Sequence, residues 1–112
     1  MGGQMTLNEV VEYCQSLEGV FERRPFGPQP LVMCVPPRKG FCDIYEKTEP
    51  LHIVVKTTPL EAAFLRMSYP CVKPGYHCNK KYWNSIYLDG SLPDEMIKQM
   101  ILKSYTLVLK AK

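Results

Sequence analysis

The side chains best suited to chemistry gather in one stretch of the chain, residues 70–93, which reads PCVKPGYHCNKKYWNSIYLDGSLP. Between Ala62 and Leu88 there are four cationic side chains and no Asp or Glu, while the formal net charge of the whole chain is only +3. The positive charge is therefore local. A basic, aromatic segment without acids can meet an anion or a nucleic acid, and it can also be an irregular connection packed on its own domain.

Each residue type in this stretch suits one part of a nucleic-acid contact. Lys80 and Lys81 suit phosphates, Asn79 suits the sugar–phosphate backbone, and an exposed ring could stack on a base. The isoelectric point near 8.6 lies below the value of about 9 that dedicated nucleic-acid domains exceed, so we expect weak, salt-sensitive DNA binding. The candidate nucleic-acid-binding residues are Arg38, Lys39, Lys73, His77, Asn79, Lys80 and Lys81, and the candidates for stacking or for lining a pocket are Tyr76, Tyr82 and Trp83.

The same side chains also suit a protein-interaction or small-ligand module without catalytic activity. Exposed Trp, Tyr and Arg anchor such contacts, although a lone tryptophan in a small domain is more often part of the core. Geometry separates the two hypotheses, because DNA binding requires the Lys80–Lys81 pair to share one basic face with Arg38 or Lys39. A ligand or peptide site requires instead a pocket lined by aromatic residues of this stretch: Tyr76, His77 and Trp83.

Neither catalysis nor metal binding is predicted. The chain has no phosphate-cradling Gly-rich motif, nucleophile elbow or HExxH motif. Its five cysteines form no CxxC pair, and His77-Cys78 with Cys71 lacks the second short ligand pair that zinc sites use. His52 is assigned to the solvent face or an edge of a sheet, with no neighbour that completes a triad. We therefore expect no enzyme, no metal and no cofactor.

Three amphipathic helices are predicted around these residues. The first begins with the capping box Thr6–Glu9 and ends before Gly19. The second begins at 58–61 (TPLE) and ends near Ser68, ahead of Tyr69-Pro70. The third begins within 91–95 (SLPDE) and carries acids in its first turn. The residues predicted for the buried face of the second helix are Leu60, Ala63, Phe64 and Met67.

Runs rich in β-forming residues at 31–35, 40–46, 51–56 and 84–88 predict four strands. Three prolines and a glycine in residues 22–30 predict an ordered loop whose Phe26 inserts into the domain. A strand-rich middle between helices predicts one α+β domain over residues 1–112. Its antiparallel sheet has four strands, or slightly more, with the helices packed on one face.

The order of these motifs resembles the MmcQ/YjbR family of small bacterial proteins across essentially the whole chain. The resemblance rests on Pro25-Phe26-Gly27-Pro28, on Tyr69-Pro70 and on the unbroken series Pro74-Gly75-Tyr76-His77, Asn79-Lys80-Lys81, Trp83-Asn84 and Leu88 to Asp94. It implies a compact α+β fold similar to the CyaY-like (frataxin-like) architecture. It also implies a link to DNA, because the family fold is similar to a double-wing domain of a phage transcription factor. The family brings no established catalytic residues.

The cellular setting follows from features near the start of the chain and from its thiols. No apolar run approaches the ~20 residues of a membrane span, and the first residues lack the basic and apolar regions of a signal peptide. An odd number of cysteines without paired spacing suits a reducing compartment. We therefore expect a cytoplasmic monomer without membrane association, whose partner is DNA or, alternatively, another protein.

Overall fold

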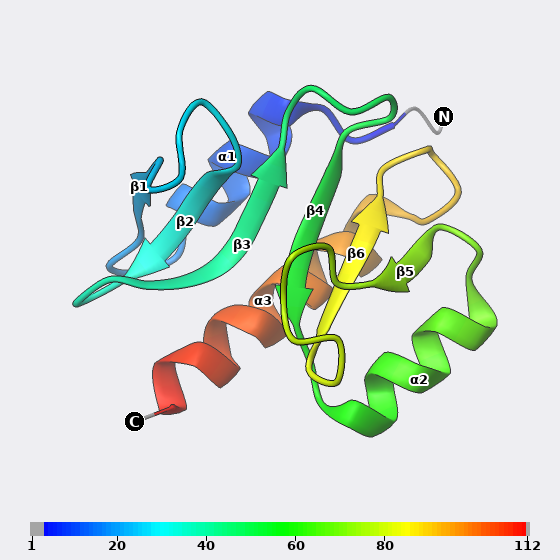
Figure 1. Cartoon of the computed structure of the whole chain (residues 1–112). Helices are drawn as coiled ribbons and strands as arrows, with labels where there is room; N and C mark the ends of the chain where they lie inside the picture. The colour runs from blue at the N-terminus through cyan, green and yellow to red at the C-terminus, as the bar shows by residue number, and fades with distance from the viewer. Residues whose placement is uncertain (1–3, 112) are drawn as a thin grey trace.

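The computed structural model describes residues 4–111, which form a six-stranded antiparallel sheet with helices on one of its faces (Figure 1). In chain order the elements are α1 (Leu7–Gln15), β1 (Phe21–Arg23), β2 (Leu31–Val35), β3 (Lys39–Tyr45), β4 (His52–Lys56), α2 (Pro59–Ser68), β5 (Val72–Pro74), β6 (Trp83–Tyr87) and α3 (Asp94–Lys110). Across the sheet the strand order is β1-β2-β3-β4-β6-β5. The predicted α+β class is confirmed, with a sheet larger than four strands.

Two of the helices begin where side-chain signals in the sequence place them. Glu9 Oε1 accepts from the Thr6 N–H at 2.8 Å while Thr6 Oγ1 accepts from the Glu9 N–H at 3.2 Å, which completes the predicted capping box of α1. Thr58 Oγ1 likewise accepts from the Glu61 N–H at 3.3 Å, with Pro59 in the first turn of α2. No helix within residues 4–111 has the length and apolarity needed to cross a membrane.

The core lies between the sheet and helices α1 and α3. One polar side chain joins the two layers: Ser104 Oγ of α3 donates to Phe41 O at 2.6 Å and accepts from the Lys56 N–H at 2.8 Å. These bonds fix α3 across β3 and β4, the strands that carry much of the site described below. The apolar helix residues buried against the sheet are Val10 and Cys14 of α1 and Ile97, Ile101 and Val108 of α3.

The sequence does not predict the two edge strands, β1 and β5. Each has three residues, too few to show a two-residue period, and each is defined by pairing with a longer neighbour. The expectation of a loop over residues 22–30 is therefore wrong at its start, and Phe26, 75% exposed, does not insert into the domain. The loop is held instead by Arg24, whose guanidinium pairs with Glu46 at 2.7 Å and donates to Pro28 O.

Helix α2 turns its apolar side outward, opposite to the prediction. Leu60 and Met67 are both 82% exposed and Phe64 is 58% exposed, and Ala63 is exposed as well. The inner side of the helix carries Ala62, which is buried, and polar contacts to β6. Because a long Arg side chain can reach buried acceptors, the apolar stripe of a helix need not mark its inner side.

Candidate functional site

The loop between β5 and β6, residues 75–82, folds back over the sheet face opposite the helices (Figure 1). We call it the covering loop. Its first residues stay close to β6, since the Gly75 N–H donates to Trp83 O at 2.9 Å and the Tyr76 N–H donates to Ser85 Oγ at 2.9 Å. A Cβ on residue 75 would lie 2.8 Å from both the Cβ and the carbonyl oxygen of Trp83, so this close approach requires glycine.

Arg66 of α2 anchors the far part of the covering loop. Its guanidinium donates to Asn84 Oδ1 at 2.6 Å, to Trp83 O at 3.1 Å and to Lys80 O. Asn84 is buried, so the contact satisfies a polar group that water does not reach. Arg66 is therefore a structural cation, and the free positive charge of this part of the chain belongs to lysines.

The ends of three adjacent strands bring the predicted basic residues to one end of the sheet. β3 begins at Lys39, and its neighbour β4 ends at Lys56, whose partner Trp83 begins β6. Just beyond β4, the Thr57 N–H donates to Tyr82 O of the covering loop at 2.7 Å. The Lys80–Lys81 pair therefore lies at the same end of the sheet as the end of β4. β3 pairs with β4 only from Cys42 onward, so the β2–β3 turn extends past the end of β4 as the tip of a protruding hairpin, apart from the covering loop (Figure 1). We call this region the basic end.

The basic side chains at and near this end differ in their exposure to solvent and in their hydrogen bonds. Arg38, Lys80 and Lys81 are exposed, and Lys73 is exposed on the edge strand β5. Lys39 is half-buried, and its ammonium group donates to Ala111 O at 2.7 Å, just beyond the C-terminus of α3. Its positive charge therefore interacts favourably with the C-terminal end of that helix.

The remaining candidates from the basic stretch are divided between loop, pocket and core. Asn79 Oδ1 accepts from the Lys81 N–H at 3.0 Å and so shapes the covering loop. Lys81 Nζ lies 5.9 Å from the Tyr82 ring centroid, over a ring that is 37% exposed. His77 has a left-handed φ of 60°, and its ring centroid lies 4.0 Å from the ring centroid of Tyr76. Trp83 is half-buried against the core.

A cavity of about 810 Å³ lies on the sheet face that the covering loop crosses, and we call it the open-face pocket. A row of rings from three adjacent strands lines it: Tyr45 stacks on His52 at 4.6 Å between centroids, and His52 stacks on Tyr87 at 4.5 Å. Tyr76 of the covering loop meets the row edge-on, 5.3 Å from Tyr45 and 5.9 Å from His52. The strand register creates the row, because residue 45 pairs with 52 and residue 52 with 87.

Burial changes the acid–base properties of two further groups in this pocket. It raises the pKa of the Asp43 carboxyl to about 6, although the Cys78 thiol donates to Oδ2 at 3.8 Å and partly opposes this rise. Burial, and then the neighbouring Asp43, raises the pKa of Cys78 to about 11. Cys78 is therefore a protonated donor at neutral pH, and Asp43 is a carboxylate with little solvation.

His52 lies on the sheet face opposite the helices, but it is buried there in a central strand, so the expected exposed or edge position is wrong. It is 2% exposed, and burial lowers its pKa to about 4, so the ring is neutral at physiological pH. Its Nδ1 lies 3.0 Å from Thr48 Oγ1, which also lies 2.9 Å from Pro50 O. Within the described residues, Nε2 of the ring has no hydrogen-bond partner.

The predicted ligand pocket is thus only partly formed by the residues expected for it. Tyr76 and His77 line the open-face pocket, whereas Trp83 does not. Sequence analysis missed the strand residues that contribute most of its chemistry: Asp43, Tyr45, His52 and Tyr87. The sequence signal for Asp43 and Tyr45 is that they lie two residues apart in a predicted strand and so share a face, whereas His52 and Tyr87 join them only through the register of β4 and β6.

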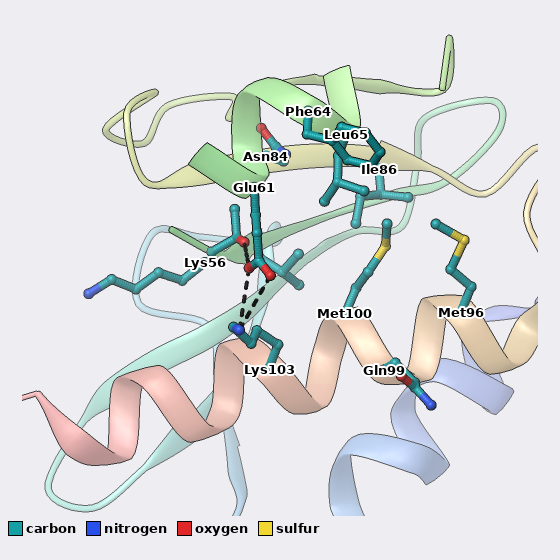
Figure 2. Close-up of a pocket in the computed structure, with 12 residues that line it drawn as sticks. Lys56, Glu61, Phe64, Leu65, Asn84, Ile86, Met96, Gln99, Met100 and Lys103 are labelled. Carbon is teal, nitrogen blue, oxygen red and sulfur yellow. Dashed lines mark hydrogen bonds and ion pairs between the residues drawn. The ribbon is translucent and has the colours of Figure 1, made fainter. Parts of the chain in front are cut away.

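The opposite sheet face carries a second, smaller hollow of about 390 Å³ between α2 and α3. Figure 2 shows Phe64 and Leu65 of α2 on one side and Met96 and Met100 of α3 on the other. Lys103 Nζ lies 3.4 Å from Glu61 Oε1 at one end of this α2–α3 groove. The groove is largely apolar, and Glu61 and Lys103 form an ion pair at its rim.

Comparison with sequence families and curated proteins points in one direction. A family model described as YjbR matches residues 15–107. The chain is 32% identical over 101 residues to the Escherichia coli K12 protein described as uncharacterised protein YjbR, which covers 90% of this chain and 85% of that protein. It is 35% identical over 57 residues to uncharacterised protein YbdF of E. coli O157:H7, covering 51% of this chain and 47% of that protein.

Solved structures extend the likeness to the fold. The crystal structure of Deinococcus radiodurans protein DR2400, with a DUF419 domain, superposes with a TM-score of 0.90 at 31% identity and covers 96% of this chain and 80% of that one. A Pseudomonas syringae protein superposes with a TM-score of 0.80 at 24% identity over 93% of this chain and 99% of that one. The second likeness concerns the fold alone.

Proposed function

The chain belongs to the MmcQ/YjbR family, and from the basic end of its sheet we propose that it binds nucleic acid weakly, through phosphate contacts. The observation that carries the proposal is that the β2–β3 turn, the end of β4 and the covering loop all lie toward the same end of the sheet. Arg38, Lys80 and Lys81 are the exposed cations there. Phosphate groups are the natural partners of such a set.

Neighbouring groups support a polyanion as the partner. Glu61, the acid at the start of α2, is held by Lys103 and by the Thr57 hydroxyl, which donates to it at 2.9 Å. The negative charge of Glu61 is therefore largely compensated by groups of the domain itself. Tyr82 is partly exposed beside Lys81, in a position to stack on a base if a single strand is bound.

The expected strength follows from the number of contacts. About four phosphate contacts give a slope of roughly −3.6 for the logarithm of the binding constant against the logarithm of salt concentration. Binding of this kind is sequence-independent and fades above physiological salt. Hairpin tips of sheet proteins dock against a groove in this way without requiring a recognition helix.

Fluorescence anisotropy tests the proposal, with a labelled mixed-sequence duplex and a labelled single strand, each titrated across a salt series. The variant Lys80→Ala/Lys81→Ala is expected to lower the salt slope by about two, because two phosphate contacts are lost. The matched control is Lys47→Ala/Lys98→Ala, which removes the same charge away from the basic end and is expected to keep the slope. Absence of binding at low salt, or equal losses in both variants, would contradict the proposal and favour a protein partner.

A further inference from the structure

The open-face pocket has a chemistry that the basic end does not use. Its lining combines aromatic rings, a buried carboxyl and a buried imidazole. Among residues 4–111, no Lys or Arg lines it, although Lys80 and Lys81 stand in the adjoining covering loop.

The hydrogen bonds around His52 determine what its free nitrogen can do. Thr48 has one hydroxyl proton, and the carbonyl of Pro50, at 2.9 Å, can only accept it. If Thr48 donates to Pro50 O, its oxygen is left to accept from His52 Nδ1–H at 3.0 Å. This arrangement satisfies all three groups and leaves Nε2 as a buried acceptor, unpartnered among residues 4–111. A buried acceptor without a donor costs free energy that a ligand N–H would recover.

The Asp43 carboxylate would also be stabilised by a ligand that donates hydrogen bonds. In the described part of the chain its carboxylate has a single side-chain donor, the weak Cys78 thiol at 3.8 Å, and burial disfavours its charge. A ligand that brings a positive charge or N–H groups would stabilise the ionised form. Tyr45 and Tyr76 present π-systems in the same pocket, and such rings attract cations.

We propose that the open-face pocket binds a small organic cation that carries N–H donors, an amine or an amidine with an apolar or aromatic body. The donors pair with the Asp43 carboxylate and His52 Nε2, and the body packs on the rings of Tyr45, Tyr76 and Tyr87. A cavity of about 810 Å³ is within the range that small-molecule sites occupy. An anion of the same shape would face two acceptors, with no Lys or Arg among the described residues that line the pocket.

Benzamidine is the probe, because it joins a planar ring to a cation with N–H donors. Benzamide and benzoate have similar shapes with a neutral and an anionic head, so they isolate the effect of charge. In ¹H–¹⁵N spectra of the labelled full chain, benzamidine is expected to give saturable shifts at 43–45, 52 and 76–78. Benzamide is expected to bind more weakly and benzoate not at all. Equal shifts with benzoate, or none with benzamidine up to about 10 mM, would overturn the proposal.

Two variants test whether benzamidine binds at the Asp43 carboxylate. Asp43→Asn is expected to weaken benzamidine binding at least tenfold, whereas Asp94→Asn, which removes an exposed carboxylate at the start of α3, is expected to leave it unchanged. Long-range ¹H–¹⁵N correlations of the imidazole provide a readout that does not depend on either variant. Free protein is expected to show His52 protonated at Nδ1, and benzamidine is expected to shift Nε2 as it gains a donor. A free Nε2–H tautomer, or an Nε2 signal that benzamidine leaves in place, would contradict the assignment.

Discussion

The sheet carries one hollow on each face, and the two have opposite chemistry. In the α2–α3 groove the lining is largely apolar, and its carboxylate, Glu61, is paired with Lys103. In the open-face pocket a buried carboxyl has a weak donor, and a buried imidazole nitrogen has none within residues 4–111. Unsatisfied buried groups cost stability, so a fold keeps them where they have a further use. For this reason the open-face pocket, and not the α2–α3 groove, is the site where we propose that a ligand binds.

Arg66 links the two faces, and its loss is expected to have the largest effect on stability. Arg66→Ala removes donors to Asn84 Oδ1, to Lys80 O of the covering loop and to Trp83 O at the start of β6. Because Asn84 is buried, we expect the free energy of unfolding to fall by about 2–4 kcal/mol. Urea titration measures it. The control is Arg24→Ala, which breaks an exposed ion pair and is expected to cost about 1 kcal/mol or less; equal losses would show that Arg66 is not an anchor.

Gly75→Ala is expected to have the next largest effect, by forcing the covering loop away from β6. The new Cβ would meet the Trp83 backbone at 2.8 Å, and backbone cannot move aside as a flexible side chain can. We expect a loss of about 1–3 kcal/mol and faster hydrogen exchange at the amides of residues 75 and 76. The β2–β3 ladder provides the internal reference, because its exchange should stay unchanged. Exchange that rises equally in both regions would point to global loosening instead.

The pH dependence of stability separates the two buried groups of the open-face pocket. The pKa of His52 is lowered to about 4 by burial, so its contribution is present above pH 6.5 and is lost as pH falls toward 4. The pKa of Asp43 is raised to about 6 by burial, so its penalty is present above pH 6 and is relieved as pH falls toward 3.8. The two contributions oppose each other between pH 6.5 and 4.5.

Variants that remove one of the two groups should therefore give opposite slopes of the urea midpoint against pH between pH 6.5 and 4.5. Asp43→Asn leaves the His52 contribution, and its urea midpoint is expected to fall from pH 6.5 to 4.5. His52→Gln leaves the Asp43 contribution, and its midpoint is expected to rise over the same range. Carboxyls whose pKa values are lowered by hydrogen bonds, such as Glu46 through Arg24, act below this range. Parallel slopes in the two variants would contradict the assigned burial.

The smallest effect is expected at the exposed side of α2. Leu60→Ser/Met67→Ser should change the free energy of unfolding by about 0.5 kcal/mol or less per residue, because both side chains are 82% exposed. A buried face would lose about 2 kcal/mol or more per residue. Ile101→Ala, in the core, is the comparison variant and should show that larger loss. A large loss in the α2 variant would place that side of the helix against the domain.

The fold could be predicted from the sequence wherever local chemistry decides it. The capping box at Thr6 and the Thr58-Pro59 start act over three or four residues and gave the correct helix starts. The strands at 31–35 and 52–56 are nearly continuous apolar runs with turns beside them. The inner side of α2 depends instead on Arg66 reaching a buried amide in another element, and no local pattern contains that contact.

The candidate site was less predictable, for a related reason. The basic residues of 73–81 are visible in the sequence because they are adjacent. The open-face pocket joins residues 43, 52, 76 and 87, which become neighbours only through the pairing of β3, β4 and β6. The side chains of a single strand do not show which residue of the next strand stands opposite. Long-range register therefore hides a site of this kind from sequence analysis.

The account is tested most directly by ¹H–¹⁵N spectra of the labelled chain with an unlabelled DNA duplex at low salt, which locate the contact on the molecule. The account predicts shifts confined to residues 38–40, 56–57 and 79–83, which disappear as salt is added. Benzamidine added to the same sample should shift a second, separate set at the open-face pocket. Duplex-induced shifts on α2, α3 or the β3–β4 turn, or no shifts at low salt, would contradict the proposed nucleic-acid contact.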